Sequence, residues 1–384
     1  MNTKVNVSKI LPVLMAFFVM SFCDLVGISV DMIKPIFKLS DLHAQLIPTS
    51  VFIWFLILSV GIGVLQHKIG KKNMVNIGMI ITAVGLFIPF FFFRSFVTFL
   101  VGFAFLGIGN TIVQVSANPL LINVVPANRT SSFLSFSQFI KAIGSMIAPW
   151  LATFFAAQFG NWKLLFLVFG IVSILSVIWL GTIKIEETKQ EGLKATLGSS
   201  FRLLGNGFIL LMVLSIFLVV GIDVGFQSNS GQFLMNHFGI NEKSAVLGRS
   251  VYFFGRMLGT FAGAIMLTMI SSRKFFIYTS ALGIAALAAI LLIPSQIVAW
   301  GLVFIIGLAV ANIFPLVFSL AVEKYPERSN EISGLMIMAV SGGAIIPLLI
   351  GWISDLSGNI AIGMSLLIIC LVYLFSVSLY CLKK

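Results

Sequence analysis

The chain has 384 residues, of which 59% are hydrophobic and only 9% are charged. With a mean hydropathy of +1.11, it carries more apolar surface than a soluble core of this size can hide from water. The formal net charge of +12 does not indicate a nucleic-acid-binding protein, because the basic residues are spread over short loops and form no basic domain.

Apolar runs of roughly 20 residues recur along the whole chain, and each can cross a hydrocarbon layer about 30 Å thick as a helix. A β-barrel is not expected, because the runs are apolar on every side rather than alternating. We therefore predict an all-α integral membrane protein with twelve transmembrane helices. Their expected limits are 9–34, 45–66, 74–93, 96–122, 130–156, 163–184, 206–235, 244–270, 275–294, 297–322, 331–354 and 360–382.

One long, charged connection, residues 184–203, divides these spans six and six. A shift of about 200 residues superimposes similar stretches of the two parts, which indicates a duplication. We predict an N-terminal six-helix bundle at 1–183, a cytoplasmic linker at 184–203 and a C-terminal six-helix bundle at 204–384. Parallel repeats of this kind place a shared site between the bundles at mid-depth.

The loop charges predict the orientation. If both termini lie on one side, that side receives sixteen lysines and arginines, and the other receives five, namely Lys34, Lys38, Arg94, Lys163 and Lys243. Such a bias favours cytoplasmic termini. The first apolar run is too long for a signal-peptide core, so we expect a retained span in a multi-pass protein of a bacterial inner membrane.

The first span contains two carboxylates, Asp24 and Asp31, with Gly27 between them. Seven residues are two helical turns, so both acids lie on one face, and a neighbour or ligand could approach closely at the glycine. Charges near the bilayer centre are costly unless they are paired or hydrated. Two interpretations stay open: a water-lined cavity, or a buried structural pair locked to Lys141 or to an arginine.

The fourth span carries three amides, Asn110, Gln114 and Asn118, which repeat every four residues. A stripe of amides can offer donors and acceptors to hydroxyl groups without net charge. The alternative is hydrogen bonding between helices, which membrane proteins use widely.

In the fifth span, Gln138 and Lys141 share a face, and Lys141 lies too deep to reach the interface comfortably. Lys141 either neutralises an acid of the first span or binds an anionic substrate. An acid paired with a cation is a poorer proton carrier, so the other acid of the first span would then carry any proton.

The seventh span places Asp223 and Gln227 one turn apart within a run of small and polar residues, from which we predict a locally broken helix beside water. In the eighth span, Arg249 and Arg256 lie two turns apart. Arg256 is near mid-span and is the best candidate partner of Asp223. Arg249 is nearer the outer surface, and we interpret it as interfacial.

We expect neither an enzyme nor a cofactor. The histidines, His43, His67 and His237, lie near span ends at no metal-ligand spacing. No nucleophile lies beside a base, and the three cysteines suggest no metal site. A membrane sensor would need a soluble output module, which the short linker does not supply.

The six-plus-six layout and the loop "GVLQHKIGKKN" (63–73) resemble the major facilitator superfamily, although His67 stands where that loop usually has an aspartate. Further stretches resemble, in order and spacing, the fucose-proton symporter family within it. They are "VDMIKP" (30–35), "QVSANPLL" (114–121), "FFGRMLGT" (253–260), "NIFPLVFSLA" (312–321) and "GWISDLSGNI" (351–360).

The resemblance implies proton-driven sugar uptake by alternating access at a site between the bundles. An acid at the position of Asp31 is associated there with sugar recognition and proton coupling. Gln114 stands where a second acid is often implicated, and Gln138 fits the family's pattern. Asp24 and Lys141 depart from the pattern, which leaves a substitute charge pair, relocated coupling or an acidic cargo as explanations.

The sequence thus predicts a secondary transporter that takes up a monosaccharide with a proton. We expect a monomer whose partners are the solute, protons and membrane lipid, without nucleic acid or metal. Asp31 and Asp24 are the candidate proton carriers, and Asp223 and Arg256 set the electric field of the second bundle. The alternative cargo is an organic anion or acidic sugar, with Lys141 and Arg256 as counter-charges. The predicted substrate-binding residues are Asp24, Asp31, Asn110, Gln114, Asn118, Gln138, Lys141 and Gln227.

Overall fold

The computed structural model describes residues 7–125, 130–185, 187, 197–267, 269–325 and 328–383. Half of the predicted linker, residues 186 and 188–196, therefore lies outside the described residues, and so does the side chain of His67. The same holds for five basic residues that contribute to the predicted charge bias: Lys4, Arg129, Lys189, Lys194 and Lys384.

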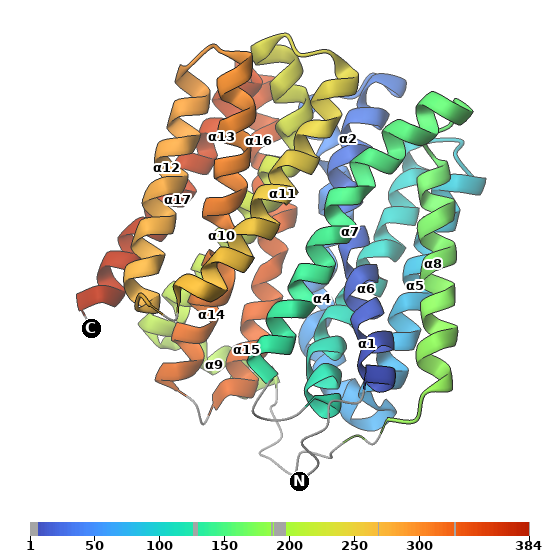
Figure 1. The fold of residues 1–384 in the computed structure, drawn as a ribbon, viewed down its shortest axis with the longest axis vertical. Coiled ribbons are helices and arrows are strands. Elements are labelled where there is room, and N and C mark those ends of the chain that lie inside the picture. The colour runs from blue at the N-terminus through green and yellow to red at the C-terminus, as the bar shows by residue number, and fades with distance from the viewer. Residues whose placement is uncertain are drawn as a thin grey trace.

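The first six spans form one group of long helices, on the right in Figure 1. The first span is α1 (Val7–Met20), the 3-10 turn η1 (Ser21–Asp24) and α2 (Leu25–Ile36), followed by the short α3 (Asp41–Ala44). The next five are α4 (Leu46–Ile69), α5 (Lys71–Phe91), α6 (Phe96–Val124), α7 (Thr130–Phe159) and α8 (Leu164–Thr182).

The second group begins after the linker with the short α9 (Leu197–Arg202) and η3 (Leu203–Gly205), and lies on the left in Figure 1. Its first three spans are α10 (Gly207–Phe238), α11 (Glu242–Met266) and α12 (Ser272–Leu292). The tenth is α13 (Gln296–Val310) with α14 (Ile313–Lys324). The last two are α15 (Ser329–Met338), η5 (Ala339–Ser341) and α16 (Gly342–Ser357), then α17 (Ile360–Lys383).

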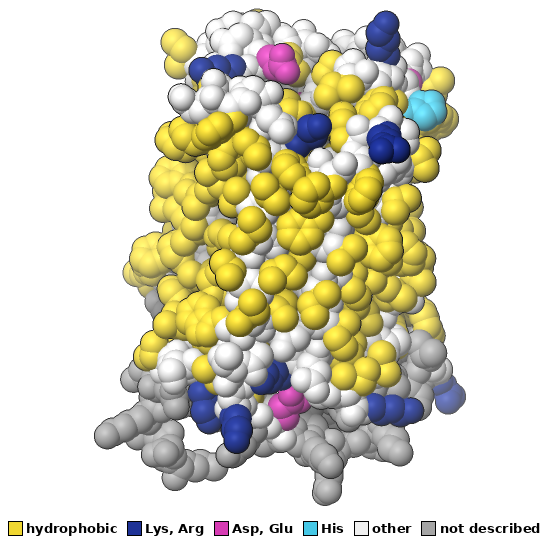
Figure 2. Space-filling view, turned by 90° about the vertical axis from the view of Figure 1, so that its right-hand side faces the viewer, with side chains coloured by type: hydrophobic (Ala, Val, Ile, Leu, Met, Phe, Trp, Pro, Cys, Tyr) yellow, Lys and Arg dark blue, Asp and Glu magenta, His cyan; other side chains and the backbone are white. Residues whose placement is uncertain are grey.

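These helices confirm the predicted fold class, and no strand occurs in the described ranges. Among the described residues, eleven candidate spans are long and apolar enough to cross a membrane by length and composition. The twelfth is α11, whose hydropathy is lowered by Arg249 and Arg256. On the face shown in Figure 2, apolar side chains cover the middle of the molecule, and the charged side chains gather above and below them.

We call the end of the molecule where α1 begins and α17 ends the terminal side, and the opposite end the far side.

Apolar packing follows the two groups of helices: one cluster contains residues from Leu203 to Cys381. The other contains residues from Ile10 to Leu180, joined by four side chains of the second group, Val224, Val246, Val340 and Ala344.

The predicted break in the seventh span is wrong, because α10 is a continuous helix from Gly207 to Phe238. Two polar side chains of the run bond to carbonyls of their own helix: the Ser228 hydroxyl donates to the Val224 carbonyl at 2.7 Å. Asn229 likewise donates to the Gly225 carbonyl at 2.9 Å. The break occurs instead in the first span, at η1, directly beside the carboxylate of Asp24.

Candidate functional site

The first span meets the second group of helices through Asp31, which forms an ion pair with Arg249 of α11. Neither side chain has exposed surface. The guanidinium also donates from Nε to the Gln227 carbonyl at 2.5 Å, and Gln232 approaches the same carboxylate at 3.5 Å. The interpretation of Arg249 as interfacial is therefore wrong. Of the two interpretations of Asp31, the structure shows the buried pair with an arginine.

Asp24 has different partners. It is 8% exposed, and its Oδ2 accepts a hydrogen bond from the Ser145 hydroxyl of α7 at 2.5 Å. Its Oδ1 accepts from Gln227 Nε2 of α10 at 3.3 Å. The Cys23 thiol donates to the same Oδ1 at 3.6 Å. All three partners are neutral, so Asp24 is held by hydrogen bonds from both groups of helices and by no direct ion pair among the described residues.

The predicted pairing of Asp223 with Arg256 is confirmed. Arg256 Nη1 lies 2.9 Å and 2.7 Å from the two carboxylate oxygens of Asp223, and the Tyr252 hydroxyl donates to Oδ1 at 2.6 Å. The pair keeps contact with solvent, since the side chains of Arg256 and Asp223 are 26% and 16% exposed.

Lys141 is half-buried on α7, and its ammonium makes no ion pair or hydrogen bond with any described residue. It is therefore not the direct partner of Asp24 or Asp31 in this structure. One turn earlier on the same helix, Gln138 is exposed. Two polar groups on α7 are thus free to contact a bound molecule.

The amide stripe of α6 is continuous but serves two purposes. Asn110 is fully buried and donates to the Met20 carbonyl at 3.0 Å, beside the break in the first span. Gln114 donates to Asn110 Oδ1 at 3.0 Å, and Asn118 lies 3.5 Å from the Gln114 carbonyl. For Asn110 the structure shows the interhelical bond, whereas Gln114 and Asn118 are half-buried and keep exposed surface.

Four charged residues are linked to this region: Ser145 and Gln227, which bond to Asp24, lie one helical turn after Lys141 and Asp223, and Asp223 pairs with Arg256. We call Asp24, Lys141, Asp223 and Arg256 the central charges. Two acids and two bases make them formally neutral when all are ionised. Because the four formal charges cancel, the set suits an uncharged ligand. Arg256 is already used by Asp223, so Lys141, which has no direct partner among the described residues, is the group that an anion would contact.

Sequence reasoning missed two residues of this region, Ser145 and Tyr252. Ser145 lies four residues after Lys141, and Tyr252 lies four residues before Arg256, so each shares a helix face with a predicted site residue. This four-residue spacing could have identified Ser145 and Tyr252 from the sequence.

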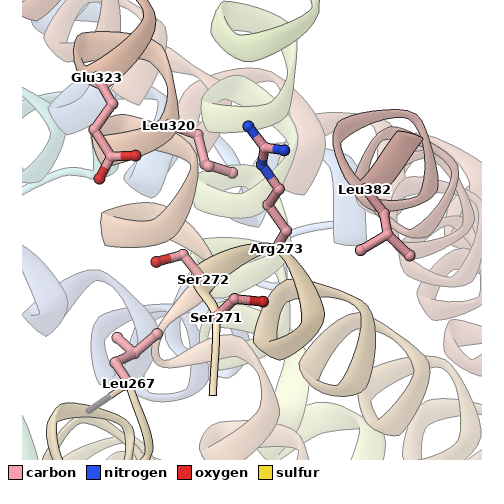
Figure 3. Close-up of a pocket in the computed structure, with 7 residues that line it drawn as sticks. All are labelled: Leu267, Ser271, Ser272, Arg273, Leu320, Glu323 and Leu382. Atoms are coloured by element: carbon pink, nitrogen blue, oxygen red, sulfur yellow. The ribbon is translucent and has the colours of Figure 1, made fainter. Parts of the chain in front are cut away.

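A separate surface hollow of about 520 Å³ lies on the second group of helices, away from these charges. Arg273, Ser271 and Glu323 line it together with leucines of α14 and α17 (Figure 3). In the part of the chain that the structure describes, no three His, Cys, Asp or Glu side chains gather as a metal site.

Comparison with known proteins identifies related chains. A glucose/galactose transporter of Brucella abortus biovar 1 (strain 9-941) is 27% identical over 381 residues, which cover 93% of this chain and 90% of that one. The L-fucose-proton symporter of Escherichia coli (strain K12) is 23% identical over 373 residues, covering 88% and 85%.

Solved structures share the fold at low identity. The E. coli fucose:proton symporter superposes with a TM-score of 0.72 at 18% identity, covering 97% of this chain and 99% of that chain. A D-xylose-proton symporter superposes with a TM-score of 0.77 at 16% identity, covering 99% and 98%. The family model described as Major Facilitator Superfamily matches residues 13–347. Because that match covers most of the chain, and the helices and buried charges are arranged as described, the protein belongs to the Major Facilitator Superfamily.

Proposed function

We propose that this protein is a secondary active transporter that takes up a neutral monosaccharide together with a proton by alternating access. The named relatives support this proposal, since they transport glucose and galactose or couple L-fucose to protons. The observation that carries it is the buried carboxylate of Asp24, which accepts hydrogen bonds from neutral side chains of both groups of helices, while Asp223 and Arg256 neutralise each other. The superfamily membership also excludes an enzyme as the main hypothesis.

The sugar would contact polar groups that keep exposed surface. Gln138 and Lys141 of α7 and Gln114 and Asn118 of α6 meet this condition. Gln227 has a buried Oε1 with no partner among the described residues, so a sugar hydroxyl could donate to it. Asn110 is already used at the break in the first span, and we assign it a supporting role instead of a direct contact.

Of the two predicted proton carriers, we propose Asp24. Asp31 forms a fully buried ion pair with Arg249. If Asp31 lost its charge, the Arg249 guanidinium would be buried without a counter-charge, which is strongly destabilising. Asp24 is held by neutral Ser145, Gln227 and the Cys23 thiol, so a proton can remove its charge without leaving a cation in direct contact. The charged groups that surround it at longer range are Lys141, Asp223 and Arg256.

We further propose that residues 1–183 and 204–384 rock as two bodies about this site, with 184–203 as a cytoplasmic linker. The clustering of apolar packing into two groups supports the division. The charge bias of the loops supports cytoplasmic termini in a bacterial inner membrane. The polar site lies within one chain, so a monomer would suffice.

The test is uptake of radiolabelled sugars into proteoliposomes. The wild-type protein is expected to accumulate a neutral hexose when the outside is acidic. Asp24→Asn is expected to lose this accumulation to the level of protein-free liposomes but to keep sugar exchange at equal concentrations, which needs no proton movement. Asp31→Asn is expected to impair exchange as well, because it breaks the dry ion pair.

Other outcomes would contradict the proposal. Uptake of a uronate but of no neutral hexose would establish the acidic-sugar alternative, with the unpaired Lys141 as counter-charge. Accumulation that ignores an imposed pH gradient would remove the proton from the mechanism. Equal exchange and accumulation in Asp24→Asn and wild type would reject Asp24 as the carrier.

A further inference from the structure

The far side of the molecule is sealed by contacts between the two groups of helices. Gln45 donates to Asn229 at 2.9 Å, and Thr49 donates to the Ala344 carbonyl at 2.8 Å. Both are hydrogen bonds between neutral groups, which water can replace when the helices separate. At the exposed rim, the Asp355 carboxylate of α16 also accepts from the backbone amides of Asp41 and Leu42 at 2.7 Å and 2.9 Å. Among the described residues, the ion pair between the two groups whose side chains are both fully buried is Asp31–Arg249, from α2 and α11.

The backbone is shaped around this pair. A Cβ atom on Gly231 would lie 1.9 Å from Asp31 Oδ2, and one on Gly27 would lie 2.6 Å from Arg249 Nε. Side chains at either position would force the pair apart. Glycine at both positions lets α2 and α10 close over the charges, so the carboxylate and guanidinium meet without water.

Gln227 connects this pair to the site. Its backbone carbonyl accepts from Arg249 Nε at 2.5 Å, while its side-chain amide donates to Asp24 Oδ1 at 3.3 Å. A hydrogen bond to an ionised carboxylate is roughly twice as strong as one between neutral groups. The hold of Gln227 on the first span therefore depends on whether Asp24 is charged.

We propose that Asp31–Arg249 is the lock that closes the far side, and that Gln227 links this lock to the charge on Asp24. Arg249 and Gln227 are thus positioning residues for transport. The inference rests on the proposed function, in which the far side must open and close. An ionised Asp24 holds α10 against the break in the first span and favours the closed lock, and a neutral Asp24 loosens that hold.

Cross-linking across the far side reports closure without any sugar. The parent carries Thr49→Cys and Ala344→Cys in a background where Cys370 and Cys381 are replaced by serine and Cys23, whose thiol contacts Asp24, is replaced by alanine. A short bis-maleimide joins the two introduced cysteines. Arg249→Met alone leaves a buried carboxylate unpaired and threatens folding, so the decisive variant is Asp31→Asn with Arg249→Met. We expect several-fold less cross-linking in this double variant than in the parent. Arg249→Lys by itself keeps a cation beside Asp31, so its cross-linking is expected to stay near the parent level.

The link through Gln227 has its own test in the same parent. Asp24→Asn removes the charge as protonation does and is expected to lower cross-linking. In a Gln227→Leu background, Asp24→Asn is expected to cause no further change. Gln232→Leu is the matched control, because Gln232 also reaches Asp31 but has no contact with Asp24, and here the response to Asp24→Asn should persist.

Two results would overturn the inference. Parent-level cross-linking in the Asp31→Asn/Arg249→Met variant would show that the ion pair does not close the far side. An unchanged response to Asp24→Asn in the Gln227→Leu background would remove Gln227 from the link. Because no sugar is present, a failure of hexose uptake by the parent would count against the proposed function alone.

Discussion

Two ion pairs of this protein differ in the water that reaches them. Asp31 and Arg249 have no exposed side-chain surface, whereas Asp223 and Arg256 keep 16% and 26%. Removing either member of the buried pair is expected to destabilise the fold strongly, because the other charge would stay buried without a counter-charge. The hydrated pair can lose a partner and recruit water.

This difference predicts unequal stability losses for two matched variants. Arg249→Met should cost about 3–5 kcal/mol, the usual penalty for stranding a buried charge. Arg256→Met should cost clearly less, because solvent reaches Asp223 and Tyr252 still donates to it. The melting temperature of the detergent-solubilised protein, followed by size-exclusion chromatography after heating, measures both.

The control for that comparison removes both charges of the dry pair at once. Asp31→Asn with Arg249→Met should regain most of the lost melting temperature. Equal losses for Arg249→Met and Arg256→Met would contradict the distinction between dry and hydrated pairs.

At the scale of an element, the break in the first span positions Asp24. The 3-10 turn at Ser21–Asp24 interrupts the regular helical bonding, and Asn110 of α6 supplies a donor to the Met20 carbonyl at 3.0 Å. Membrane interiors tolerate such interruptions only where other groups satisfy the freed backbone. Asn110 therefore holds the geometry of the site from a neighbouring helix.

We expect Asn110→Leu to lower stability by about 1–3 kcal/mol, the cost of an unsatisfied buried polar group, and to reduce sugar exchange because Asp24 is displaced. Thr111→Val is the neighbouring control, since the Thr111 hydroxyl bonds only to the Gly107 carbonyl of its own helix. Melting temperature and exchange rate, measured side by side, test this. A greater loss in Thr111→Val than in Asn110→Leu would count against the assignment.

At the scale of the whole molecule, the connection between the two groups of helices is bonded to the first residues of α5. Glu187 of the linker accepts from the backbone amides of Lys71 and Lys72 at 2.6 Å and 2.9 Å. Lys72 Nζ in turn donates to the Gly181 and Ile183 carbonyls at the end of α8. A linker carboxylate thus supplies a negative group to the loop in which His67 replaces the usual aspartate.

Glu187→Ala should cost about 0.5–2 kcal/mol, as for loss of a helix cap, and should slow sugar exchange by loosening the linker. Glu242→Ala is the control, because Glu242 is exposed at the first turn of α11 and has no partner among the described residues. Exchange rates and melting temperatures of the two variants provide the measurement. Identical behaviour of both would show that the linker contact is dispensable.

Particular residues show how far sequence reasoning reached. The pair Asp223–Arg256 was predictable because both residues stand near mid-span of consecutive helices. Arg249 was misplaced because its distance from the helix end suggested an interface, while the covering comes from α2 and α10, which are distant in sequence. The polar run 227–232 suggested a broken helix, yet Ser228 and Asn229 find acceptors on their own helix.

The sequence by itself determined the membrane setting, the number of spans and the stripes on which polar residues lie, because hydrophobic length and helical periodicity are local properties. Only the tertiary structure decided which cation neutralises which acid, and which polar groups stay open to solvent. Those outcomes depend on how closely distant helices approach: Gly27 and Gly231 admit Arg249 to Asp31, whereas Lys141 is left without a counter-charge in direct contact among the described residues.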